Sequence, residues 1–200
     1  MSSSTKRRDA KEISAAILQT TEFLFTKYGV ENVSMHQIAK AAKVGQGTMY
    51  RRYANKGDLC MDLMKEHFQS LQEETIQYLK DAKAISVKER IQVIFKRLLY
   101  YVEQHSRLFE AIQSYTTCEK TKKPFYDAPP YVFMHNTIRL LLEEAIETKV
   151  VRPINADFTA HTLLSSINPK MYIFLRQKNG YTAEEIIENF NKSLLEPLFY

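Results

Sequence analysis

Residues 46–52, QGTMYRR, bring an amide, a hydroxyl and two guanidinium groups into one short segment. The amide of Gln46 can pair bidentately with adenine N6 and N7, and Thr48 can offer its methyl to thymine or its hydroxyl to a phosphate. Arg51 and Arg52 suit phosphate contacts, although Arg51 can equally be a solvated surface charge. The segment therefore predicts contact with nucleic acid.

The charge distribution supports this interpretation. Residues 1–56 hold ten Lys/Arg against four Asp/Glu, a net charge of +6, whereas residues 57–200 hold eighteen against nineteen. A small basic segment beside a near-neutral remainder is typical of nucleic-acid binders. A solvated tail explains Lys6, Arg7 and Arg8, but it explains less well the basic residues that lie within patterned helices.

Other chemistry finds no support in the motifs. There is no Gly-x-Ser-x-Gly, phosphate loop or His-Glu-x-x-His, and Gly45-x-Gly47 lacks the third glycine of a dinucleotide fingerprint. The five histidines are scattered singly, and Cys60 and Cys118 have no partner at metal-ligand spacing. We therefore expect no catalytic residue, no metal and no cofactor, and an enzyme in the C-terminal part is the weakest alternative.

Composition predicts an all-α protein. Only five of 200 residues are glycine, and no proline precedes Pro124. Strand-rich and alternating folds need more turns than this supplies. The longest apolar runs have five residues, against roughly 20 for a membrane span. The first twelve residues are polar and show no secretory signal, so we expect a cytoplasmic protein.

Hydrophobic periodicity and capping boxes predict nine helices. Capping boxes open helices at Ser34, Ser86 and Thr182, and Gly29 and Gly180 each end one. Pro169 is expected to kink one long helix. A break at residues 43–47 is expected to separate the second and third helices. The predicted helices are 9–28, 34–42, 48–53, 58–82, 86–104, 106–117, 131–149, 157–178 and 182–198.

Residues 33–59, VSMHQIAKAAKVGQGTMYRRYANKGDL, resemble the DNA-binding signature of the TetR family of transcriptional regulators. Leu24-Phe25-x-x-x-Gly29 also matches the end of that family's first helix. The resemblance implies a helix-turn-helix DNA-binding domain at 1–56 and a helical effector-binding and dimerisation domain at 57–200. Departures occur at Glu22, Lys43 and Gly45, where the family usually has an aliphatic residue, a turn glycine and a small polar residue.

The resemblance also implies which residues contact DNA. The second helix of such a motif enters the major groove, which makes Gln46 the candidate for base reading and lets Gly47 bring the backbone close. Tyr50 and Lys56 resemble the family's phosphate-contacting tyrosine and lysine. Core packing is the better interpretation of Ile38, Ala39, Val44, Met49 and Tyr53. The full predicted set is Ser34, His36, Gln46, Gly47, Thr48, Tyr50, Arg51, Arg52 and Lys56.

The remaining implications concern partners. A homodimer through residues 157–178 and 182–198 would read a near-palindromic operator in double-stranded DNA. We expect a repressor released by a small hydrophobic or aromatic ligand; control by a protein partner, or activation, is the alternative. Aromatic and methionine side chains suggest the pocket, although such a stripe is more often core packing. The candidate ligand-binding residues are Phe95, Tyr101, Phe109, Tyr115, Met134 and Tyr172.

Overall fold

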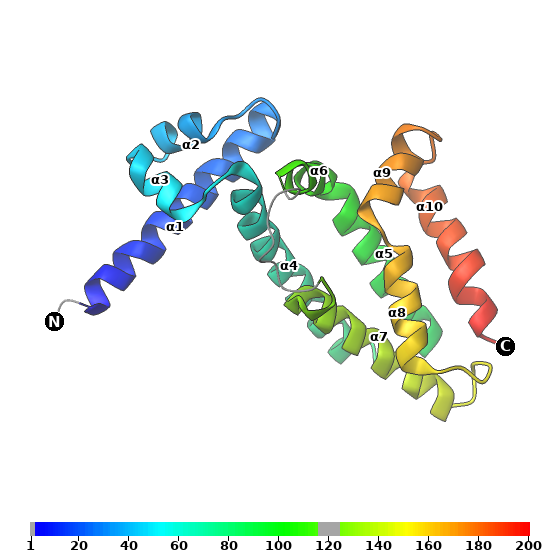
Figure 1. The fold of residues 1–200 in the computed structure, drawn as a ribbon. Helices are drawn as coiled ribbons and strands as arrows, with labels where there is room; N and C mark the ends of the chain where they lie inside the picture. The colour runs from blue at the N-terminus through cyan, green and yellow to red at the C-terminus, as the bar shows by residue number, and fades with distance from the viewer. Residues whose placement is uncertain (1–2, 116–124) are drawn as a thin grey trace. The chain divides into compact units, whose positions relative to one another are not determined.

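A computed structural model of the protein describes residues 3–115 and 125–200 (Figure 1). These residues form helices joined by short connections, and no strand occurs among them. One isolated antiparallel bridge pairs Val151 with Phe199. The predicted all-α class is confirmed. Within the described ranges, no helix is both long and apolar enough to cross a membrane.

The chain divides into two compact units. The first comprises residues 1–67 and 107–120, and the second comprises residues 68–106 and 121–200. Helix α4 (Lys56–Asp81) continues from the first unit into the second, and nearly all of α6 (Ser106–Tyr115) belongs with the first.

The first unit holds α1 (Ser3–Tyr28), α2 (Met35–Ala41) and α3 (Gln46–Arg52). Gly29, at φ +84°, ends α1, because the left-handed conformation costs glycine little. The turn between α2 and α3 uses Lys43 at φ +54°, which explains why glycine is usual there.

Three predicted helix starts in this unit were wrong, and one of them is that of α4, which begins at Lys56 and not Asp58. Helix α1 begins at Ser3, six residues before the predicted start, and α3 begins at Gln46 and not Thr48. For α3 the reason is local, since the Gly45 carbonyl accepts hydrogen bonds from the N–H groups of Thr48 and Met49 at 2.9 and 3.0 Å. Gly45 is thus the N-cap, and Gln46 and Gly47 lie in the first helical turn.

The second unit is built from the rest of α4 together with α5 (Val87–Gln104), α7 (Pro129–Glu147), α8 (Ala156–Ser166), α9 (Pro169–Gln177) and α10 (Ala183–Phe190). A short 3₁₀ turn, η2 (Phe125–Asp127), precedes α7. After α10 the chain continues in the wider turn η3 (Asn191–Leu195) and the 3₁₀ turn η4 (Glu196–Leu198).

Pro129 and Pro169 of this unit stand at the start of α-helices. The predicted kink at Pro169 is a complete break, because Asn168 caps α9 with its side chain and Pro169 occupies the first turn. Pro129 likewise opens α7 two residues before the predicted start. Proline has no backbone N–H, but the N–H groups of the first helical turn make no hydrogen bond within the helix. Proline is therefore tolerated at that position. The described residues consequently form ten α-helices where nine were predicted.

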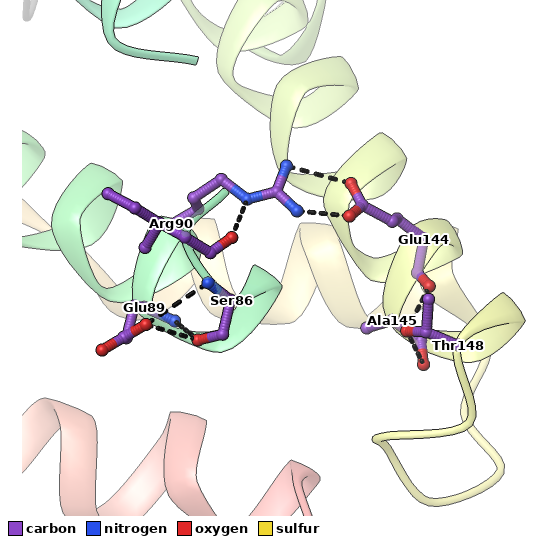
Figure 2. Close-up of polar contacts among 7 residues, drawn as sticks. Ser86, Glu89, Arg90, Glu144, Ala145 and Thr148 are labelled. Atoms are coloured by element: carbon purple, nitrogen blue, oxygen red, sulfur yellow. Dashed lines mark hydrogen bonds and ion pairs between the residues drawn. The ribbon is translucent and has the colours of Figure 1, made fainter. Parts of the chain in front are cut away.

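A buried arginine joins α5 to α7 (Figure 2). The Arg90 guanidinium donates to both carboxylate oxygens of Glu144, with Nη1 at 3.0 Å from Oε2, and its Nε donates to the Ile85 carbonyl at 3.1 Å. Beside it, Ser86 and Glu89 form the predicted capping box of α5. The Arg90 side chain is 10% exposed and that of Glu144 43% exposed, so the arginine depends more on the pair.

We expect Glu144→Ala to lower the free energy of unfolding by about 1–3 kcal/mol, because it leaves a buried guanidinium with one acceptor. The matched control is Glu143→Ala on the same helix, which removes the partly exposed pair with Arg139 and should cost less than about 0.5 kcal/mol. Urea unfolding followed by circular dichroism measures both. Equal losses would contradict a special role for the Arg90 pair.

Candidate nucleic-acid interface

Helix α2 begins at a complete capping box. Ser34 Oγ accepts a hydrogen bond from the Gln37 N–H at 3.2 Å and donates to Gln37 Oε1 at 2.9 Å, while the Ser34 N–H donates to the same oxygen at 2.7 Å. Ser34 and His36 are both exposed. The hydroxyl of Ser34 is thus occupied in capping, and His36 presents its ring on the same exposed turn.

Gln46 and His36 meet across the turn between α2 and α3. The side-chain amide of Gln46 lies 2.7 Å from His36 Nδ1 and donates to it. An amide carries two N–H donors and one carbonyl acceptor, so one donor and the acceptor remain. Those are the two groups that bidentate pairing with adenine requires. The contact orients the Gln46 side chain without consuming its capacity to read a base.

Nothing in the surrounding chain requires a glycine at position 47. Its φ is not positive, and a Cβ added to it would meet nothing within 4 Å. Glycine in a helix costs up to about 1 kcal/mol relative to alanine. A glycine that neither a turn nor internal packing needs is consistent with a surface that another molecule approaches closely.

Thr48, Tyr50 and Arg51 complete the outward side of α3. Tyr50 is 52% exposed, and Arg51 is exposed with its Nη2 donating to Thr48 Oγ1 at 3.1 Å. The Thr48 hydroxyl keeps its own proton available for donation. An amide, a hydroxyl, a phenol and a guanidinium therefore share one short helix.

Arg52 and Lys56, both predicted to contact DNA, form hydrogen bonds to other groups of the chain. Arg52 is half-buried and its Nη1 donates to Ser14 Oγ at 2.6 Å, which ties α3 to α1. Lys56 Nζ donates to the carbonyls of Val30 and Val33 at 2.7 and 2.8 Å. A lysine has three N–H donors, so one remains for an outside acceptor. Both residues therefore help to hold the helices of the motif in place. The sequence did not predict this structural role.

Buried residues beneath these side chains hold the motif together. Ile38, Ala39 and Met49 are fully buried and Tyr53 is 3% exposed, as predicted, whereas Val44 is only half-buried. Burial, with Asp62 nearby, raises the pKa of Tyr53 to about 12, so its phenol stays protonated. Met49 is the buried residue of α3, and the neighbouring Tyr50 and Arg51 are exposed.

The electrostatics of the surface favour anions. Neither α2 nor α3 contains a carboxylate, while Lys40, Arg51 and Arg52 lie in their last turns. At the turn between α1 and α2, Glu31 is paired with Arg107 Nη1 of α6 at 2.8 Å. A backbone hydrogen bond, with Arg107 and Lys56 nearby, lowers the pKa of that carboxyl. The helices that form the motif thus present positive charge without an acidic side chain of their own.

The candidate ligand-binding residues do not line one common pocket. Phe95 is fully buried and stacks on Phe190 with ring centroids 5.0 Å apart, and Tyr101 and Met134 are also buried. Phe109 is half-buried on α6, in the first unit. The side chain of Tyr115 lies outside the described residues. Most of this set is core packing, and only Tyr172 lines the cavity described next.

A cavity of about 330 Å³ lies within the second unit, bordered by α5, α9, α10 and the end of α8. Such a volume is at the lower end of the range for small-molecule pockets. The Tyr172 hydroxyl is buried, and burial together with the neighbouring Glu103 carboxylate raises its pKa. The lining is mainly apolar, with Leu99, Ile167, Met171, Tyr172, Leu175, Tyr181, Ile186, Phe190 and Leu194 beside Ser166, Asn168, Asn189 and Ser193.

Comparison with solved structures identifies the architecture. Thermus thermophilus FadR, a TetR-family transcriptional repressor in complex with lauroyl-CoA, matches with a TM-score of 0.68 at 19% identity over 94% of this chain and 95% of that one. AibR, in complex with isovaleryl coenzyme A and operator DNA, matches with a TM-score of 0.60 at 19% identity over 94% and 100%. These likenesses establish the fold.

Comparison of sequences finds relatives over part of the chain. An HTH-type transcriptional regulator of Staphylococcus aureus strain MRSA252 is 33% identical over 115 residues, which are 54% of this chain and 57% of that protein. The chain therefore aligns with little more than half of this relative. Residues 17–61 match the family model described as bacterial regulatory proteins, tetR family. This relative and the Thermus thermophilus protein are both described as transcriptional regulators. The matched residues 17–61 thus belong to the TetR family of bacterial regulatory proteins, and the chain shares the fold of the solved TetR-family repressor.

Proposed function

We propose that the protein is a sequence-specific DNA-binding repressor that a small hydrophobic ligand releases from its operator. The observation that carries the DNA-binding part is the outward side of α3, where Gln46, Thr48, Tyr50 and Arg51 stand around a glycine with open space above it. In the major groove, the first turn of α3 would face base edges. Gln46 would then read adenine, and Tyr50 and Arg51 would hold phosphates.

Exposed apolar side chains on α8 and α9 support a homodimer. Phe158, Phe174 and Met171 are 70%, 54% and 49% exposed. Large apolar side chains in such numbers are typical of a surface that another protein covers. A second copy of the chain is the partner that a near-palindromic operator requires, because each copy reads one half-site. We therefore propose pairing through α8, α9 and α10.

The apolar cavity supports a hydrophobic effector. Its rim includes Met171 and Tyr181, which are exposed and lie among the helices of the proposed dimer surface. A ligand there would press on residues that set the spacing of the two copies, and so would change the affinity for two half-sites at once. Two proteins of this fold were solved with acyl-coenzyme A ligands, so acyl compounds come first among those to test.

We expect Gln46→Ala to relax specificity at one position in each half-site by roughly 1–3 kcal/mol, because it removes a bidentate contact to a base edge. Binding to a library of single-base operator variants measures this. A dimer predicts two affected positions related by the operator's symmetry. A single affected position would contradict two-fold reading.

Two further variants are controls for Gln46→Ala. Arg51→Ala should weaken binding to all sequences alike and lower the salt dependence by about one phosphate contact. His36→Ala tests whether Gln46 acts through its hydrogen-bond partner. Loss of specificity at the same position in His36→Ala, with none in Gln46→Ala, would mean that Gln46 does not read a base.

We expect Gly47→Ala to have opposite effects on folding and on binding. The added methyl has open space and suits the helix, so the free energy of unfolding should rise by up to about 1 kcal/mol. Operator affinity should fall because the methyl separates the backbone of α3 from DNA. Thermal melting and gel shift measure the two effects. Unchanged affinity in a stabilised variant would show that DNA does not approach Gly47.

We expect a fatty acid, an acyl-coenzyme A or an aromatic compound to raise the melting temperature and to release the operator. Ser193→Phe should abolish both responses by filling the cavity from its exposed rim, whereas Ser193→Ala should preserve them. Thermal shift followed by gel shift tests each compound. No response to any compound would favour control by a protein partner.

A further inference from the structure

Two histidines and an aspartate from α7 and α8 meet in the second unit. His135 Nε2 lies 3.3 Å from Asp157 Oδ1 and 3.4 Å from the Asp157 carbonyl oxygen. The rings of His135 and His161 face each other with centroids 3.9 Å apart and planes inclined by 26°. One potential ligand atom from each of the three residues lies within 4.8 Å of the other two.

Helical spacing explains why these side chains converge. Asp157 and His161 are four residues apart on α8, and Tyr131 and His135 are four residues apart on α7, so each pair shares one helix face. Helices α7 and α8 pack against each other, which brings the two faces together. His135 and His161, which stand singly in the sequence, thus lie together in the fold. The two four-residue spacings were the available signal.

We propose that His135, Asp157 and His161 form a binding site for a divalent transition-metal ion of the zinc type. Imidazole nitrogen and carboxylate oxygen are ligands that zinc accepts. Zinc bonds to these atoms of about 2.0–2.1 Å at the tetrahedral angle place neighbouring ligands about 3.3–3.4 Å apart. The separation of His135 Nε2 from Asp157 Oδ1 already has that value. Rotation of the His161 side chain brings in the third ligand, and a fourth position stays open to solvent or a small anion.

Tyr131 supplies the outer contact that histidine ligands usually have. Its hydroxyl oxygen lies 2.6 Å from His161 Nδ1, which leaves Nε2 of that ring for the metal. In the metal-bound state, His161 Nδ1–H donates to the Tyr131 oxygen and fixes the orientation of the ring.

The access and the burial of the cluster suit ion binding. The side chain of His135 is 11% exposed and that of Asp157 64% exposed, so the site has a buried wall and an open side. A bound ion would join α7 to the first turn of α8.

Metal titration of the full chain, freed of metal by EDTA and dialysis, tests the proposal without DNA or effector. We expect one zinc ion per chain by calorimetry, a rise in melting temperature, and a cobalt absorption spectrum of tetrahedral nitrogen and oxygen ligation. His135→Ala and His161→Ala should abolish binding, and Asp157→Asn should weaken it. His36→Ala, which removes an exposed histidine elsewhere, should leave it unchanged.

Tyr131→Phe tests whether the Tyr131 hydroxyl orients the His161 ring for metal binding or only contributes to packing. It should lower zinc affinity by roughly 10–100-fold while the stoichiometry stays at one, because the His161 ring loses its anchor. Circular dichroism of each metal-free variant confirms that the fold is retained. Zinc binding that persists in the folded His135→Ala and His161→Ala variants, or that occurs only at millimolar zinc, would overturn the proposal. Operator binding by the metal-free protein would support the proposed DNA-binding function and would neither support nor contradict the zinc site.

Discussion

The helix-turn-helix motif depends on the hydrogen bonds of the Lys56 ammonium group. A motif made of two seven-residue helices has a small core, so burial alone gives it limited stability. Lys56, at the start of α4, donates to the carbonyls of Val30 and Val33, which lie in the turn between α1 and α2. The bond from Arg52 to Ser14 adds a tie between α3 and α1. Charged side chains thereby fix the angles at which the short helices leave the longer ones.

Local signals predicted the helices, and tertiary contacts account for the errors. The capping boxes at Ser34, Ser86 and Thr182 are present as predicted, because they involve residues only three positions apart. The break at Pro169 needed the additional cap from Asn168, which a proline alone does not disclose. Lys56 and Arg52 were predicted as phosphate contacts, and their partners lie 23 to 38 residues away. No local pattern reports such a pairing.

The candidate sites differ in predictability for the same reason. Gln46 and Tyr50 lie on a short exposed helix, where position along the helix determines which side chains face outward. In the second unit, aromatic residues occur on every helix, and composition does not separate a cavity wall from a packed core. Phe95 was assigned to the wall, but it stacks on Phe190 inside the core. Six of the thirteen residues that line the cavity lie on helices α9 and α10, where the sequence predicted a dimer surface and a single ligand-binding candidate, Tyr172.

A residue with an unfavourable local conformation, or a glycine within a helix, points to function only when the rest of the chain does not explain it. Lys43 has a left-handed backbone in the turn of the motif, but Lys149 has the same conformation just after α7, outside the motif. A cation near a helix C-terminus interacts favourably with the helix dipole, which is reason enough for lysine at both places. Gly47 has no such reason, because neither its backbone angle nor its surroundings require glycine. Of these departures, Gly47 is therefore the one that points to a surface another molecule must approach.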